Sequence, residues 1–137
     1  MLVCEEITEQ IIGAAIDVHR ALGPGLLESL YQEAMVFELE RRSLHVQRQV
    51  EIPIVYKDQT LGGAFRLDLV VERTVVVELK AVDHVLPVHE AQLLSYLRLT
   101  DLPVGLLLNF NVAAMKQGIT RRANTKYSPL RVTAPPR

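Results

Sequence analysis

Cysteine and aromatic residues are scarce in this chain of 137 residues. The one cysteine, Cys4, excludes a disulfide within the chain and a zinc site built on a cysteine cluster. Tryptophan is absent and aromatic residues make up 5% of the sequence, which leaves little surface on which the bases of a single strand could stack. No apolar run reaches about 18 residues, so the sequence predicts no membrane-spanning helix. Residues 1–10 contain acids and no basic group, unlike a signal peptide, and we therefore expect a cytoplasmic protein.

Acidic residues are missing from the C-terminal segment. Residues 116–137 contain six Lys or Arg and no Asp or Glu, whereas residues 1–115 contain nine basic and sixteen acidic groups. The net charge of −1 does not by itself indicate a nucleic-acid-binding protein. A basic tail on an acidic body could steer a polyanion to one edge, and a solvated tail explains the same composition equally well. The expected organisation is one domain over residues 1–115 and a basic C-terminal extension over residues 116–137.

Hydrophobic spacing predicts an α/β fold. The expected helices span residues 5–22, 26–42 and 88–99, and the expected strands span residues 45–56, 65–71, 75–82 and 104–110. Gly and Pro in LGPG separate the first two helices, and KDQTLGG is expected to be a turn. A short helix could follow residue 111. The order α-α-β-β-β-α-β predicts a mixed β-sheet flanked by helices.

Three charged residues interrupt the apolar strand pair FRLDLVVERTVVVELKAV, residues 65–82. Burying an unpaired charge is costly, so Asp68, Glu78 and Lys80 need compensating partners. Side chains alternate along a strand, which places Glu78 and Lys80 on one face. Asp68 faces Glu78 only if the turn consists of the three residues 72–74, a common hairpin length. That register predicts two converging carboxylates beside a lysine.

Two interpretations of these charges remain open on the residues alone. In the first, Mg²⁺ takes carboxylate oxygens, polarises a phosphoryl oxygen and activates a water, while a lysine stabilises the developing charge. In the second, the three residues form a partly buried ion-pair network that only fixes the register of the strands. If the two carboxylates lie on the same face of the sheet, they can share a metal ion; if they lie on opposite faces, the catalytic interpretation fails.

The segment from Asp68 to Lys80 resembles the core signature of the PD-(D/E)XK nuclease superfamily, with Leu67 where that signature has proline. GLLESLY, which contains Gly25, Glu28 and Tyr31, resembles the motif of one branch of it, the GxxExxY proteins. VHEAQLLSYL resembles the later helix motif of the superfamily, and VGLLLNF resembles the last core strand of the branch. The resemblance covers about residues 5–112.

The resemblance implies a restriction-endonuclease-like core and a nuclease that hydrolyses phosphodiester bonds of nucleic acid, with DNA the favoured partner. It implies Asp68, Glu78 and the carbonyl of Leu79 as ligands of Mg²⁺ or Mn²⁺. It also implies Lys80 as the residue that orients water or stabilises charge. The remaining members of the implied catalytic set are Glu28, from the first core helix, and Gln92.

Five further residues are candidates for substrate contact, namely Tyr31, Tyr96, Arg66, Arg121 and Arg122. Each has a structural interpretation as well, because tyrosines fill cores and arginines pair with carboxylates or lie in solvated tails. Lys126 belongs with the two C-terminal arginines. A catalytically silent module that binds nucleic acid or a protein partner is the alternative function, and a homodimer that places two sites on one duplex stays open.

Overall fold

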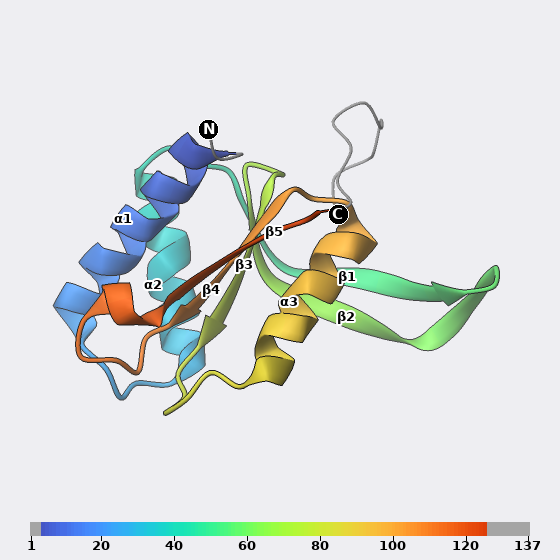
Figure 1. The fold of residues 1–137 in the computed structure, drawn as a ribbon. Coiled ribbons are helices and arrows are strands. Elements are labelled where there is room, and N and C mark those ends of the chain that lie inside the picture. Colours follow the sequence, from blue (N-terminus) through green and yellow to red (C-terminus); the bar gives the residue numbers. More distant parts are fainter. Residues whose placement is uncertain (1–3, 126–137) are drawn as a thin grey trace.

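Residues 4–125, the part of the chain that this computed structural model describes, form a five-stranded mixed sheet with helices on both faces (Figure 1). The elements are α1 (Glu5–Leu22), α2 (Glu28–Arg41), β1 (Val46–Tyr56), β2 (Gln59–Val71), β3 (Val75–Lys80), α3 (Pro87–Thr100), β4 (Val104–Asn109), the 3-10 helix η1 (Met115–Gly118) and β5 (Ile119–Ala123). The α/β class and the predicted order of elements are confirmed.

The strands follow each other across the sheet in chain order, β1-β2-β3-β4-β5. All neighbours are antiparallel except β3 and β4, which are parallel and are connected through α3. The carboxyl ends of β3 and β4 therefore lie at the same end of the sheet. Lys80 pairs with Asn109 at that end.

Each face of the sheet has its own hydrophobic core. Helices α1 and α2 pack on one face, where Val77, Leu79 and Leu106 are fully buried. Helix α3 covers the other face through Leu93 and Leu97. Because successive residues of a strand alternate between faces, β3 and β4 are apolar at nearly every position, as expected for strands that are covered on both sides.

Helix α1 begins and ends where the sequence predicts. Its apolar spacing buries Ile11, Ala15 and Val18 against the sheet. Gly23 follows with φ of 68°, a left-handed conformation that favours glycine, and its N–H caps the carbonyl of His19 over 2.7 Å. The break between the first two helices is thus fixed by backbone chemistry.

Two strands differ from the predicted ones. The expected turn KDQTLGG is confined to Lys57 and Asp58, which both have positive φ, and β2 begins directly afterwards at Gln59. In addition, part of the expected C-terminal extension lies in the sheet, since η1 and β5 occupy residues 115–123 and β5 pairs with β4. Residues 126–137 of the expected extension, which include Lys126, lie outside the described residues.

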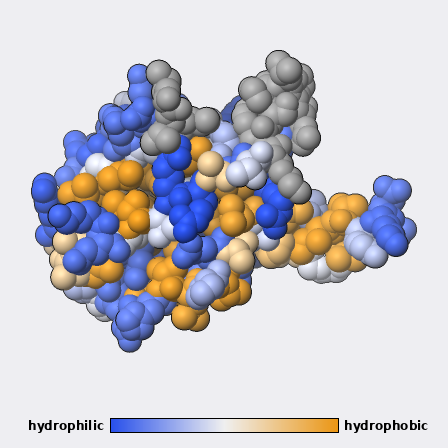
Figure 2. Space-filling model, viewed as in Figure 1, coloured by the Kyte–Doolittle hydropathy of each residue, from blue (hydrophilic) through white to orange (hydrophobic). Residues whose placement is uncertain are grey.

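The outer halves of β1 and β2 form a two-stranded arm that projects from the body of the fold (Figure 1). Figure 2 shows apolar colour along this arm with a hydrophilic tip. Its exposed apolar residues include Val55, Tyr56 and Leu61. Among residues 4–125, no helix has the length and hydropathy of a membrane span.

Candidate active site

The β2–β3 hairpin has the register that brings Asp68 opposite Glu78. Leu69 pairs with Val77 and Val71 pairs with Val75, and the turn between the strands is the three residues 72–74. Glu72 and Arg73 both have positive φ in this turn. The predicted odd-length turn and register are confirmed, and both carboxylates point to the face of the sheet that carries α3.

The two carboxylates replace the last hydrogen bonds of the β2–β3 ladder. The backbone N–H of Asp68 donates to Glu78 Oε1 over 3.0 Å, and the N–H of Leu79 donates to Asp68 Oδ2 over 2.8 Å. The two carboxyl groups also lie close enough to influence each other's pKa. The pairing of β2 with β3 therefore ends just where the two acids meet. We call the surroundings of Asp68 and Glu78, at the carboxyl end of β3, the carboxylate notch.

Burial dominates the electrostatics of this pair. Glu78 is 6% exposed, and burial together with the charge of Asp68 raises the pKa of Glu78 to about 8. Burial also raises the pKa of Asp68, although the N–H of Leu79 opposes the rise. A pair of this kind binds a proton near neutral pH or requires a compensating cation.

Lys80 and Glu28 lie beside the carboxylate pair. Burial raises the pKa values of Asp68, Glu78 and Glu28, and the positive charge of Lys80 opposes that rise, so the lysine acts on all three acids. Burial raises the pKa of Glu28, and the backbone N–H of Ala81 counters part of that rise. Glu28 opens α2 on the far side of the sheet edge, so elements distant in sequence converge at the carboxyl end of β3.

Helix α3 contributes Tyr96 to the same notch. Burial raises the pKa of Tyr96, and the charges of Glu78 and Asp68 raise it further, which places its hydroxyl in their field. Its ring meets Phe65 edge-on with the centroids 4.9 Å apart. Gln92 lies one helical turn earlier on the same side of α3, with an exposed side chain.

Four of the residues that we predicted to contact substrate lie elsewhere. Tyr31 is fully buried, stacks on Phe110 and accepts from the N–H of Leu26 while donating to the carbonyl of Gly23. Its hydroxyl thus holds the loop between α1 and α2 together. The tyrosine is three residues from Glu28 but turns into the core, whereas Glu28 reaches the sheet edge.

The arginines are also dispersed. Arg66 pairs with Glu51 across β1 and β2, and both side chains are largely exposed. Arg122 pairs with Glu90 of α3. Arg121, next to it on β5, points to the opposite face and lies near Cys4, whose pKa is raised by burial and only partly lowered by the charge of Arg121. The structure does not gather these arginines around the carboxylate pair.

Two residues that we did not assign support the site. Asn109 is 3% exposed; its side chain accepts from the N–H of Val82 over 3.1 Å and donates to the carbonyl of Val82 over 2.9 Å. This clamp fixes the chain directly after Lys80. His89 accepts the N–H of Leu86 on Nδ1 over 3.0 Å, and its ring lies close enough to Glu28 to influence the pKa of that acid. The sequence does contain a signal for Asn109, because it is the one polar residue of VGLLLN and ends this otherwise apolar, buried run.

The site offers hard oxygen donors to a metal ion. Within residues 4–125, no group of three or more His, Cys, Asp or Glu side chains gathers that could hold a metal. A cation here would therefore rest on the two carboxylates of Asp68 and Glu78. Two carboxylates with water and substrate oxygens in the other positions are typical of Mg²⁺, so the donor set fits this ion.

The family model described as the PD-(D/E)XK nuclease superfamily matches residues 5–122 of the chain. This range contains the whole sheet except the last residue of β5, and it contains all the residues of the carboxylate notch. Neither a curated protein nor a solved structure matches the chain.

Proposed function

Because the chain belongs to the PD-(D/E)XK nuclease superfamily, we propose that it is a divalent-metal-dependent nuclease that hydrolyses phosphodiester bonds of nucleic acid. The observation that carries this proposal is the convergence of Asp68, Glu78 and Lys80 at the carboxyl end of β3. DNA is the first substrate to test.

In this proposal Asp68, Glu78 and the carbonyl of Leu79 hold Mg²⁺ or Mn²⁺. When bound, the ion stabilises negative charge on the phosphoryl group and lowers the pKa of a bound water. The raised pKa of Glu78 supports this assignment, because its ionised form lacks sufficient compensation from Lys80 alone. The same linkage makes binding of the ion release protons.

The other side chains of the notch orient the reactants. The ammonium group of Lys80 orients the attacking water and stabilises negative charge on the phosphoryl oxygens. Glu28, with its pKa raised by burial, accepts the proton of that water. Tyr96 and Gln92 contact the substrate strand from α3, on the side opposite Glu28. Cleavage of both strands of a duplex would require two such sites, so a homodimer is part of the proposal for duplex substrates.

The experiment that tests the proposal is cleavage of a DNA and RNA panel with linear, nicked, single-stranded and branched substrates. Wild type is compared with Asp68→Ala and Lys80→Ala in Mg²⁺, in Mn²⁺ and in EDTA. We expect metal-dependent cleavage by wild type and a loss of at least about a hundredfold in each variant, with circular dichroism unchanged. Cleavage that survives both substitutions would contradict the assignment of the site.

A second candidate is a module that binds nucleic acid or a protein without cleaving. The observation that favours it is that each carboxylate already accepts a hydrogen bond from the backbone of the neighbouring strand. Such a pair can hold a shared proton and remain structural near neutral pH. The same panel separates the two candidates, since the module would bind a substrate that it leaves intact in both metals.

A further inference from the structure

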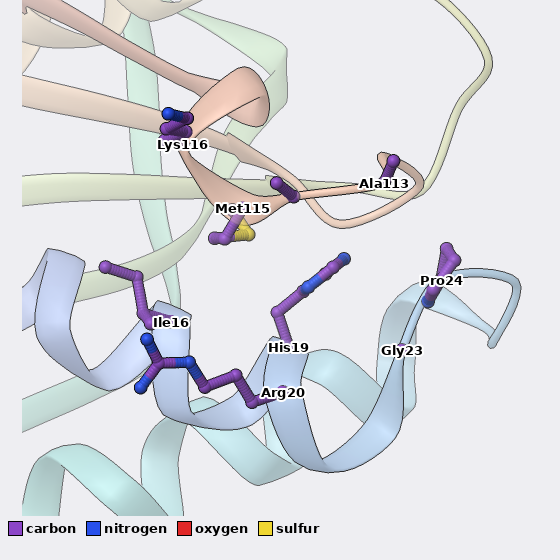
Figure 3. A pocket seen from close by; sticks show the side chains of 9 residues that line it. Ile16, His19, Arg20, Gly23, Pro24, Ala113, Met115 and Lys116 are labelled. Atoms are coloured by element: carbon purple, nitrogen blue, oxygen red, sulfur yellow. The ribbon is translucent and has the colours of Figure 1, made fainter.

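A pocket of about 470 Å³ lies between the C-terminal end of α1 and the loop that follows β4 (Figure 3). Its apolar lining comes from Ile16, Pro24 and Met115, and its polar lining from His19, Arg20 and Lys116. No carboxylate lines it. A volume of this size falls in the range of about 300–1,000 Å³ that is usual for small-molecule sites.

The pocket presents two cations, Arg20 and Lys116. Arg20 approaches from α1 and Lys116 from η1, both with exposed side chains. Within the described part of the chain, neither of them forms an ion pair with a carboxylate. An apolar floor with unpaired cations at its rim is complementary to a ligand that joins a flat apolar group to an anion.

His19 adds a polar group of fixed orientation. It is 7% exposed, and its Nε2 lies 2.8 Å from the carbonyl oxygen of Val112. Because a carbonyl oxygen only accepts, the proton of the ring sits on Nε2. This bond ties the loop wall of the pocket to α1, so the pocket is preformed.

Two short, fixed segments connect the pocket to the carboxylate notch. The loop that contributes Pro24 leads to Glu28 and is held by the hydroxyl of Tyr31. The segment that leads from β4 to η1, and so to Met115, leaves β4 at Asn109, whose side chain clamps Val82. The N–H of Phe110 in this segment donates to the carbonyl of Lys80 over 2.9 Å. The pocket and the notch therefore share one end of the sheet and keep a constant spacing.

We propose that this pocket is a nucleotide subsite, which takes one unstacked nucleotide of the substrate strand with its base on Ile16, Pro24 and Met115 and its phosphate between Arg20 and Lys116. The inference rests on the proposed nuclease function and extends it to a second contact point. A nucleic-acid strand that is held both in the pocket and at the carboxylate notch passes Glu28 at the edge of the sheet. The spacing of the two places then determines where the strand is cut relative to the held nucleotide.

The test measures binding without hydrolysis. Fluorescence anisotropy follows a short fluorescein-labelled oligothymidylate in EDTA, with free thymidine monophosphate as the competitor. Arg20→Ala with Lys116→Ala removes the two charges, and Ala113→Glu places a carboxylate at the rim while both cations remain. Arg48→Ala with Arg73→Ala and, separately, Ala123→Glu are matched controls outside the pocket, because all three side chains are exposed and none lines it.

We expect binding of the oligonucleotide to weaken by about tenfold or more in both pocket variants and to remain within about twofold in the controls. The free mononucleotide should compete far less well than the strand. Equal weakening by pocket and control variants, or no binding by wild type, would overturn the subsite. A mononucleotide that binds as tightly as the strand would also overturn it, because the pocket would then serve a free nucleotide.

Cleavage data keep this inference separate from the nuclease proposal. If wild type cleaves no member of the panel but the pocket variants lose binding, the nuclease proposal fails and the subsite stands. If wild type cleaves and the pocket variants neither bind more weakly nor shift the positions of the cuts, the subsite alone fails.

Discussion

Asp68 and Glu78 are joined across the β2–β3 hairpin through their main chains, because the N–H of Asp68 donates to Glu78 Oε1 over 3.0 Å and Asp68 Oδ2 accepts from the N–H of Leu79 over 2.8 Å. The acids thus occupy positions that carbonyl oxygens hold elsewhere in the ladder. Their placement is fixed by strand register and not by flexible loops. A site built in this way is rigid before any ligand binds.

The protonation of Glu78 links the site to stability. Its pKa is about 8 in the folded protein and about 4.5 when exposed, so the folded state binds the extra proton. Stability from this proton is fully present below about pH 4.5 and is lost as the pH rises through about 8. Without divalent metal, we predict that the free energy of unfolding falls over this window by on the order of a few kcal/mol.

The variant Glu78→Gln tests that prediction, since its amide oxygen still accepts from the N–H of Asp68 but does not ionise. Urea unfolding at a series of pH values in EDTA should give a flatter profile for the variant and a higher stability than wild type above about pH 8. Glu33→Gln, at an exposed position of α2, should leave the profile of wild type unchanged. Parallel profiles for wild type and Glu78→Gln would contradict the raised pKa.

Tyr31 should matter for stability through its hydroxyl. Replacement by Phe keeps the ring on Phe110 but removes the bonds to Gly23 and Leu26, of 2.5 and 3.1 Å. We predict a loss of about 1–2 kcal/mol in the free energy of unfolding, measured as a shift of the urea midpoint at constant slope. Tyr56→Phe, at a side chain that is 60% exposed, is the control and should cause no shift. An unchanged midpoint for Tyr31→Phe would show that the loop does not depend on this hydroxyl.

Gly118 supports the clamp at Asn109. A Cβ at this position would overlap the carbonyl oxygen of Asn109 and lie 3.2 Å from Val112 Cγ2, so the backbone must shift. We predict that Gly118→Ala destabilises the fold by about 1–3 kcal/mol in thermal or urea unfolding. A Cβ at Gly62 meets nothing within 4 Å, and Gly62→Ala should be close to neutral. Equal stabilities for the two variants would argue against tight packing behind the notch.

Much of this arrangement follows from sequence because local rules and the tertiary fold agree. The apolar spacing of α1 and the break at Gly23 set that helix to the residue. In the hairpin, parity alone leaves only an odd-length turn if Asp68 and Glu78 are to share a face, and the turn at residues 72–74 satisfies it. The match to the family model then agrees with the motif that starts at Asp68.

Other features depend on tertiary context that residue patterns do not contain. Strand β2 begins at Gln59 because backbone pairing in an exposed arm does not require apolar side chains. Strand β5 is short and polar, and the edge of β4 supplies its partners. The alternation of a strand sends Arg121 and Arg122 to opposite faces, so their adjacency in sequence did not indicate a joint site.

The residues of the candidate site also divide into those that the sequence could predict and those that depend on the tertiary fold. Asp68, Glu78 and Lys80 could be located because strand parity ties them together. The burial of Tyr31 could not be predicted from sequence. Glu28 and Tyr31 are three residues apart on the first turn of α2, yet Tyr31 meets the core and Glu28 meets the edge of the sheet. The pKa of Glu78 also depends on burial by α3 and β4, which come later in the chain.

The most direct measurement is titration of the protein with Mn²⁺ by isothermal calorimetry, because it tests the shared ion without any knowledge of the substrate. We predict one Mn²⁺ per chain, binding at least about tenfold weaker in Asp68→Asn and in Glu78→Gln, and binding retained in Lys80→Ala, which removes a like charge beside the ion. Wild-type affinity in Asp68→Asn and Glu78→Gln would contradict a metal shared by the two carboxylates.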